Sequence, residues 1–171
     1  MSRLLPLSLL FISLVIINAC NAPDKSAEWQ TMTLYGTNGI IVGVHDGDGT
    51  NEHGEQTFFD FEARLNERTG KLVGKIIGMT VICDLPGDDG VGNPEIEERF
   101  ATLAIIFEDG DEIMSTAAFE FPANEVKLKN NNPQLRTIIG GTGKYKGIRG
   151  QMEVTRNADE TYLYTIEYKV D

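Results

Sequence analysis

The chain has 171 residues, 41% of them hydrophobic and 24% charged, and its 26 acidic side chains against 15 basic ones give a net charge of −11. This size fits one globular domain with a core large enough to fold alone. The acidic balance argues against nucleic acid as a partner and against electrostatic adhesion to anionic lipid, because both require basic surface to neutralise phosphates.

The N-terminus has the layout of a secretion signal. Arg3 precedes an apolar run from Leu4 to Ile17, and small residues follow the run. The run is too short and wrongly flanked for a membrane-spanning helix, which needs about 20 apolar residues. We therefore expect the chain to be exported.

The end of this run, Ile17-Asn18-Ala19-Cys20, resembles a bacterial lipobox, in which a peptidase cuts before the cysteine and that cysteine carries the lipid. Ordinary cleavage without a lipid is the alternative. We expect residues 1–19 to be a lipoprotein signal peptide, Cys20 to be lipidated, and residues 20–35 to form the lipidated N-terminus and a polar tether. Asn21 replaces the aspartate associated with inner-membrane retention, which favours the outer membrane.

The chain contains two cysteines, Cys20 and Cys83. If Cys20 is acylated, Cys83 has no partner, so we expect no internal disulfide. Cys83 lies in the apolar segment MTVICDL, which predicts a buried packing role rather than a nucleophile.

The remaining sequence predicts an all-β domain, because β-branched and aromatic stretches recur between turn signals and helical periodicity is almost absent. The predicted strands are 39–45, 57–65, 71–83, 97–107, 112–121, 134–139, 147–156 and 161–170. Eight strands are the number at which a small antiparallel barrel closes around side chains or one small ligand. Short connections rich in Gly, Asn and Asp predict hairpins at 66–70, 108–112, 141–145 and 157–160.

Two segments invite a metal or phosphate interpretation. The acidic loop DGDGTNEHGE (46–55) fails the EF-hand pattern, which needs Gly and Glu where Asn51 and Thr57 stand. The two histidines make weak ligands, so we expect no metal site, with an irregular calcium loop as the alternative to a solvated turn. The stretch IIGGTGKYKGIRGQ (138–151) fails the phosphate-loop pattern at Ile138 and Tyr145, which predicts a hairpin turn instead.

Five residues are candidates for an interior pocket. Glu62 would be a carboxylate tuned by burial for proton transfer or for stabilising a cation, or else an exposed strand glutamate. Arg149 follows the glycine-rich turn and would be a pocket or a surface cation. Tyr162, Tyr164 and Tyr168 share one face of the last strand and would line the pocket or pack in the core.

The C-terminal third resembles the allene oxide cyclase and dirigent-like barrel superfamily. The stretch IIGGTGKYKGIRGQMEV followed by YLYTIEYKV is similar to its G-G-[TS]-G-x-[YF]-x-G-x-x-G hallmark and last strand. The segments FEARLNERTGKLVGKIIGMTV and IIFEDGDEIMSTAAF resemble preceding parts of the family in the same order. The resemblance covers roughly residues 55 to 170.

This resemblance implies an eight-stranded antiparallel barrel with a hydrophobic cavity, commonly a homotrimer, that works without metal or organic cofactor. It places Glu62 near an acidic residue of dirigent proteins and Arg149 at the arginine of their A-R-G segment. Thr80 stands where the cyclases have a cysteine. With Tyr164 as a hydrogen-bonding wall, Glu62 and Arg149 form the catalytic prediction, and Thr80, Tyr145 and Tyr162 form the ligand-binding prediction.

We therefore expect residues 36–171 to form the barrel of an exported, lipid-anchored protein that binds a small hydrophobic molecule. As an enzyme it would be a cofactor-independent cyclase or isomerase, or a dirigent-type stereochemical guide, acting by positioning a reactive substrate. The alternative is a non-catalytic ligand-binding or structural envelope lipoprotein.

Overall fold

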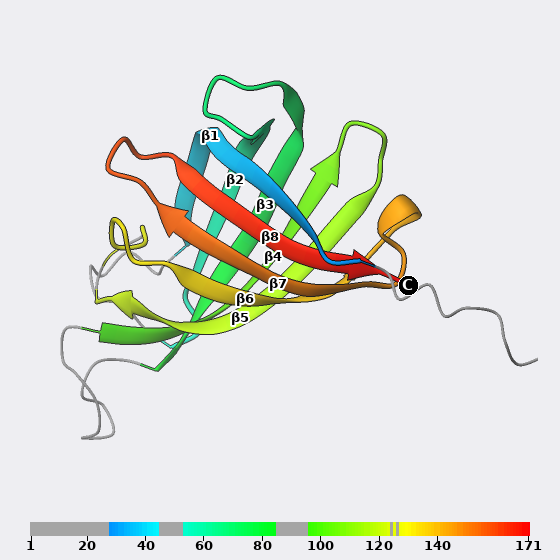
Figure 1. Cartoon of the computed structure of the whole chain (residues 1–171). Helices are drawn as coiled ribbons and strands as arrows, with labels where there is room; N and C mark the ends of the chain where they lie inside the picture. The colour runs from blue at the N-terminus through cyan, green and yellow to red at the C-terminus, as the bar shows by residue number, and fades with distance from the viewer. Residues whose placement is uncertain (1–27, 45–52, 85–95, 124, 126) are drawn as a thin grey trace, which may run out of the picture.

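A computed structural model describes residues 28–44, 53–84, 96–123, 125 and 127–171. Eight strands in chain order close into an antiparallel barrel (Figure 1). They are β1 (Gln30–Val44), β2 (Gln56–Leu65), β3 (Leu72–Asp84), β4 (Ile96–Phe107), β5 (Glu112–Pro122), β6 (Gln134–Gly141), β7 (Ile148–Arg156) and β8 (Tyr162–Val170), with a 3-10 turn η1 (Gly143–Tyr145) between β6 and β7. The predicted all-β, eight-stranded barrel is confirmed. In the described part of the chain, no helix is long and apolar enough to cross a membrane.

Strand β1 is longer than the predicted strand 39–45, because it begins at Gln30 and so includes part of the segment assigned to the tether. Residues 30–36 pair with β8, and residues 34–44 pair with β2. The pairing with β2 has a register shift between Thr37 and Ile40, where Asn38 has a φ of 50°. This bulge bends the strand so that it closes the barrel.

The barrel interior is built by period-two alternation. Along β4 the side chains of Ala101, Leu103, Ile105 and Phe107 are buried, and the residues between them are not. The same alternation on the other strands gives one continuous core. Burial of this apolar surface is the main source of stability in a chain for which the structure describes no disulfide.

The glycine-rich stretch closes one end of the barrel. Tyr145 of η1 is buried and packs on Phe107 and Tyr168, with ring centroids 5.0 Å and 6.0 Å away. Gly150 has a φ of 154°, and a Cβ there would lie 2.0 Å from the Glu167 carbonyl oxygen. The stretch is therefore the predicted hairpin turn, and we call this part of the molecule the η1 end (right in Figure 1).

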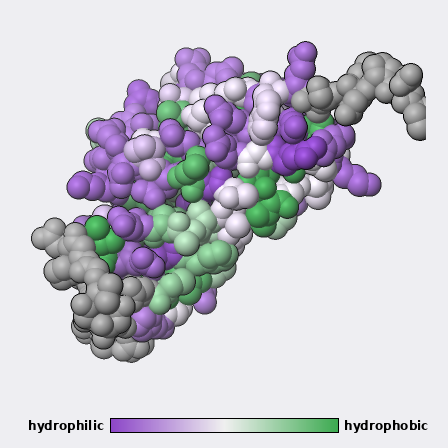
Figure 2. Space-filling model, turned by 60° about the horizontal axis from the view of Figure 1, so that its bottom comes forward, coloured by the Kyte–Doolittle hydropathy of each residue, from purple (hydrophilic) through white to green (hydrophobic). Residues whose placement is uncertain are grey.

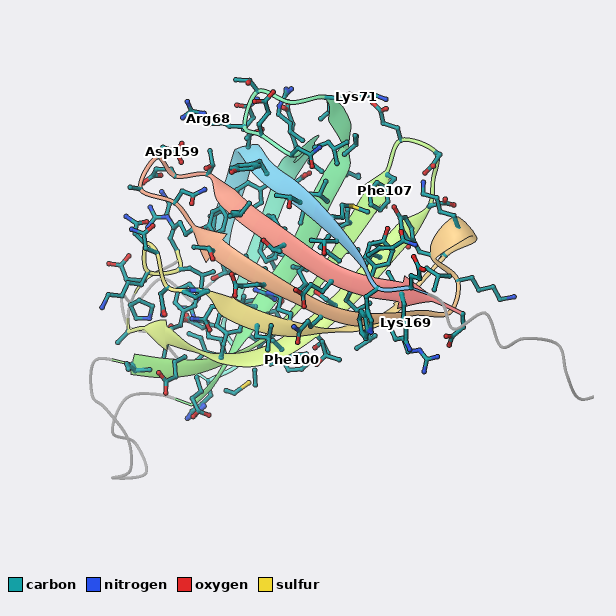
Figure 3. All side chains as sticks on the ribbon, in the orientation of Figure 1. Arg68, Lys71, Phe100, Phe107, Asp159 and Lys169 are labelled. Atoms are coloured by element: carbon teal, nitrogen blue, oxygen red, sulfur yellow. The ribbon has the colours of Figure 1, made fainter. Side chains whose placement is uncertain are left out.

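The outer face of β1 to β5 carries an apolar patch. Phe58, Phe100 and Met114 are 42%, 47% and 41% exposed. Strand pairing places Phe58 beside Met79 and Val42, and Phe100 beside Ala118. Hydrophobic side chains gather in a band across this lower face, which includes Phe100 (Figures 2 and 3).

Cys83 is exposed, so the prediction of a buried packing role is wrong. On β3 the neighbouring Thr80 and Ile82 point into the barrel, and the pleat turns Cys83 outward. His45 and most of the acidic loop 46–55 lie outside the described residues. Among the residues described, no three His, Cys, Asp or Glu side chains form a cluster that could hold a metal ion.

Candidate functional site

A cavity lies inside the barrel, towards the end where β1, β3, β5 and β7 finish and the even-numbered strands begin. We call this the cavity end. Its lining is mostly aromatic and aliphatic, with a few polar groups: Ile41, Thr57, Phe59, Phe61, Thr80, Leu103, Phe119, Phe121, Leu128, Arg136, Val154, Tyr162 and Tyr164. All eight strands contribute, and the polar side chains Thr57, Thr80 and Arg136 come from β2, β3 and β6.

The free volume of the cavity is about 40 Å³. That is space for on the order of three water molecules. Pockets that hold drug-sized ligands are roughly ten times larger, about 300–1,000 Å³. Side chains therefore fill most of the interior, and a larger guest would have to displace aromatic rings.

Two glycines allow aromatic rings of the cavity lining to lie close to the backbone. A Cβ on Gly36 would lie 3.0 Å from Tyr164 Cε2, and a Cβ on Gly78 would lie 2.5 Å from Phe59 Cζ. The missing side chains allow these rings to rest against the backbone of β1 and β3. Phe61 and Tyr162 pack together with ring centroids 4.9 Å apart.

Arg136 brings a positive charge into this apolar interior. It is 4% exposed, and its guanidinium carbon lies 5.0 Å from the centroid of the Phe119 ring. Its Nε and Nη1 atoms have no hydrogen-bond acceptor among the described residues. Burial lowers the pKa of the Arg136 guanidinium. The group still carries its proton at neutral pH, because a guanidinium is too basic to lose its proton in a protein.

Three other polar residues face the same space. Burial raises the pKa of Tyr164 far above its usual value, and the charge of Arg136 offsets only part of that shift. Burial likewise raises the pKa of Tyr162. Both are neutral phenols at pH 7, able to donate a hydrogen bond. The buried hydroxyl of Thr80 also has no partner among the described residues.

A buried ion pair lies at the same end of the barrel. Arg99 and Glu97, both on β4, are 3% and 2% exposed and are joined by a salt bridge. Arg99 also donates to Thr57 Oγ1 at 3.3 Å and to the Glu125 carbonyl oxygen at 2.6 Å, and it stacks on Phe121 with its guanidinium carbon 4.0 Å from the ring centroid. These contacts satisfy the Arg99 charge and tie the start of β2 to the chain beyond β5.

Glu62 and Arg149 do not line the cavity, which corrects the expectation that they act there. Glu62 is on the outer face of β2, where it accepts hydrogen bonds from Arg64 at 2.7 Å and Asn38 at 3.0 Å. These two bonds hold its pKa below the usual value. The Arg149 side chain is 58% exposed and pairs with Asp171. Both residues fall on the solvent side of the strand alternation.

Thr80, Tyr162 and Tyr164 lie in the cavity lining, as the ligand-site and hydrogen-bonding predictions require. Tyr145 does not, because it is part of the η1 end. Cys20 lies outside the described residues. Sequence reasoning missed Arg136, Arg99 and Glu97, although a period-two count places each of them in phase with buried neighbours on its strand.

An outer groove of about 850 Å³ adjoins the cavity. Ile41, Phe61 and Tyr162 line both spaces, so these side chains form the wall between them. The outer rim is charged: Arg68 pairs with Asp159 at 2.6 Å, and both can be seen at the upper left of Figure 3.

Comparisons with known proteins show the fold. The chain is similar to a pyocyanin demethylase (21% identity, TM-score 0.61, 82% of this chain and 100% of the other). It is also similar to a pterocarpan synthase dirigent protein (16% identity, TM-score 0.59, 91% of this chain and 96% of the other). A third similar structure is a Diels–Alderase from Streptomyces koyangensis (13% identity, TM-score 0.59, 86% of this chain and 71% of the other). Protein-family models and the sequences of curated proteins gave no match. The fold is the allene oxide cyclase and dirigent-like barrel that the sequence resemblance predicted.

Proposed function

We propose that the barrel binds a small hydrophobic molecule at its cavity end. The observation that carries this proposal is an interior lined by aromatic rings but provided with unpaired polar groups, those of Arg136 and Thr80. Apolar walls with a few convergent polar groups are typical of ligand sites. Structural neighbours named for a demethylase, a dirigent protein and a Diels–Alderase add support, because their names describe reactions of small molecules.

Because the free volume is small, binding requires movement of the lining. The rings of Phe61 and Tyr162 separate the cavity from the outer groove, so their displacement would join the two spaces. Side-chain rotation of this kind is common when ligands bind.

Native mass spectrometry tests the proposal. Purified protein is incubated with an envelope extract, and retained masses are compared between wild type, Val154→Phe and Ile139→Phe. Val154 lines the cavity, whereas Ile139 is 55% exposed on the outside, so the second variant adds a ring without filling the interior. We expect a ligand mass on wild type and Ile139→Phe that Val154→Phe loses. Equal retention by all three proteins, or none on wild type, contradicts interior binding.

A second candidate function is cofactor-independent cyclisation or isomerisation of the bound molecule. The buried guanidinium of Arg136 beside the neutral phenol of Tyr164 favours this, because both groups stabilise negative charge that develops on a substrate oxygen. Glu97, a fully buried carboxylate at the same end of the barrel, is engaged by Arg99. Catalysis would therefore rest on orientation and charge stabilisation rather than on a carboxylate base. Non-catalytic binding is the alternative.

We further propose that the barrel is anchored to the cell envelope, at the outer membrane, by a lipid on Cys20. The lipobox-like segment before Cys20 supports this proposal. Labelling cells with a radioactive fatty acid should mark the wild-type protein and not Cys20→Ala. Equal labelling of the two would exclude the anchor.

We also propose that the barrel self-associates as a homotrimer through the apolar patch on the outer face of β1 to β5. Phe58, Phe100 and Met114 are large exposed hydrophobic side chains on β2, β4 and β5. Exposed apolar surface of this kind marks interaction sites. A second copy of the same chain is the partner that the sequence resemblance implies.

A further inference from the structure

Arg136 is a buried cation with two unused donor nitrogens. It is 4% exposed, and its Nε and Nη1 atoms have no acceptor within hydrogen-bond distance in the described part of the chain. Buried charges in proteins are normally paired and hydrogen-bonded, because an unpaired one is strongly destabilising. Arg136 therefore lacks the partner that its position demands.

The barrel does provide such a partner to its other buried arginine. Arg99 is bonded to the Glu97 carboxylate, the Thr57 hydroxyl and the Glu125 carbonyl. Arg136 faces the ring of Phe119 instead. The two buried arginines at this end of the barrel thus differ in their partners. Arg99 is paired with a carboxylate, whereas Arg136 is not and lines the cavity.

Among the described residues, the neighbouring side chains do not provide an anion for Arg136. Tyr164 is near enough for its phenol and the guanidinium to influence each other, but burial keeps that phenol protonated at neutral pH. Glu97 is committed to Arg99. An acceptor with negative charge must come from outside the described chain, or else water fills the space.

We propose that the molecule bound in the cavity is an aromatic oxyanion, a flat ring that carries a carboxylate or a phenolate oxygen, and that this oxygen pairs with Arg136. The inference rests on the proposed function, the uptake of a small hydrophobic molecule by the barrel interior. The rings of Phe59, Phe61 and Phe119 provide apolar faces against which a planar ring stacks. A charge-assisted hydrogen bond in this buried, mostly apolar interior favours the anion over a neutral analogue of the same shape.

Matched probes test the proposal by NMR titration of the purified protein. Benzoate and 1-naphthoate are compared with benzyl alcohol and 1-naphthalenemethanol, and the methyl signals of Thr80 and Val154 report on the cavity. The proteins are wild type, Arg136→Met and Lys146→Met. The lysine variant removes the same charge from an exposed position.

We expect wild type and Lys146→Met to bind each carboxylate about ten-fold or more tightly than the matching alcohol, the ratio that a hydrogen bond to a charged group supplies. Arg136→Met should lose this preference while it still binds the alcohols. Equal affinity of wild type for acid and alcohol overturns the oxyanion and leaves interior binding intact. If no probe shifts the cavity signals of wild type, interior binding of such molecules is overturned as well.

Thermal unfolding of Arg136→Met gives a second, independent readout. If Arg136 lacks a partner in the free protein, the variant should melt at the same temperature as wild type or higher, because it removes an unpaired buried charge. A large drop in its melting temperature would show that Arg136 is paired within the protein, and it would overturn the proposal even where the variant fails to fold.

Discussion

Gly39 lies directly against the ring of Phe61: a Cβ added to residue 39 would be 1.9 Å from Cδ1 and 2.0 Å from Cε1 of that ring. Gly39→Ala should therefore push Phe61 out of its position in the wall between cavity and groove. We expect a loss of about 1–3 kcal/mol of unfolding free energy, the usual range for overpacking. Urea unfolding measures it. Gly140→Ala is the matched control, because a Cβ there meets no atom within 4 Å.

The buried pair at the cavity end leads to a second prediction. Glu97→Gln leaves the Arg99 charge without its carboxylate at a buried position. We expect the variant to lose about 3–5 kcal/mol of unfolding free energy. Glu62→Gln, which removes an exposed carboxylate that is also paired with an arginine, should unfold like wild type.

A double variant tests whether the lost unfolding free energy of Glu97→Gln comes from the unpaired charge of Arg99. Glu97→Leu combined with Arg99→Met removes both charges and should recover much of the stability, because buried pairs are replaceable by apolar side chains. If Glu97→Gln is as stable as wild type in urea, the described pairing of Arg99 is wrong.

The two ends of the barrel should be separable by mutation. Tyr145 packs on Phe107 and Tyr168 at the η1 end, away from the cavity lining. Tyr145→Ala should cost about 3–5 kcal/mol of unfolding free energy, as large aromatic truncations do. At a temperature where the variant is still folded, its affinity for cavity probes should equal that of wild type. If the variant is as stable as wild type but no longer binds the probes, Tyr145 belongs to the ligand site and this prediction is wrong.

Acid should weaken the turn between β7 and β8. The Asp159 carboxylate accepts hydrogen bonds from the Thr161 hydroxyl at 2.6 Å and the Thr161 amide at 3.1 Å, and these hold its pKa below the ordinary 3.8. A group whose pKa is lowered by folding stabilises the folded state above its unfolded pKa and loses this contribution as the pH falls. Asp159→Asn should therefore show a shallower loss of stability between about pH 4 and pH 2. Parallel curves for the two proteins in urea would contradict the prediction.

Self-association should depend on the apolar patch. Phe100→Glu places a charge in the middle of that patch and should convert a trimer to monomers, because burying an unpaired carboxylate in an interface is unfavourable. Leu135→Glu is the control, since Leu135 is 60% exposed on β6, outside the patch. Analytical ultracentrifugation distinguishes the species. A monomeric wild type, or equal association of Phe100→Glu and wild type, excludes this interface.

The strands from β2 to β8 could be predicted from sequence because their alternation and turn residues agree. The part of β1 before residue 39 could not, since Gly36 and Asn38 interrupt its pattern and are weak strand formers. Pairing with β8 overrides that local preference. Closure of a barrel is a long-range requirement, which a short window of sequence does not contain.

Long-range strand pairing also explains why some cavity residues could be predicted from the sequence and Arg136 could not. Thr80, Tyr162 and Tyr164 fall on apolar faces of their strands, so the alternation of side chains predicted that they face the interior, where they line the cavity. In QLRTIIGG the opposite face is the more apolar one, with Leu135 and Ile139, and the structure exposes it while burying Arg136. Hydrophobicity alone would bury the wrong face of this strand, and its pairing with β5 and β7 determines which face is inside.

The glycine-rich stretch that closes the η1 end has a consequence for the search for relatives. Its glycines answer to backbone geometry, because a Cβ on Gly150 would lie 2.0 Å from the Glu167 carbonyl oxygen. We expect barrels with unrelated ligands to share such a stretch, so that a search guided by it collects one architecture with many chemistries. The residue types at interior positions such as 99 and 136 should differ between barrels that bind different ligands.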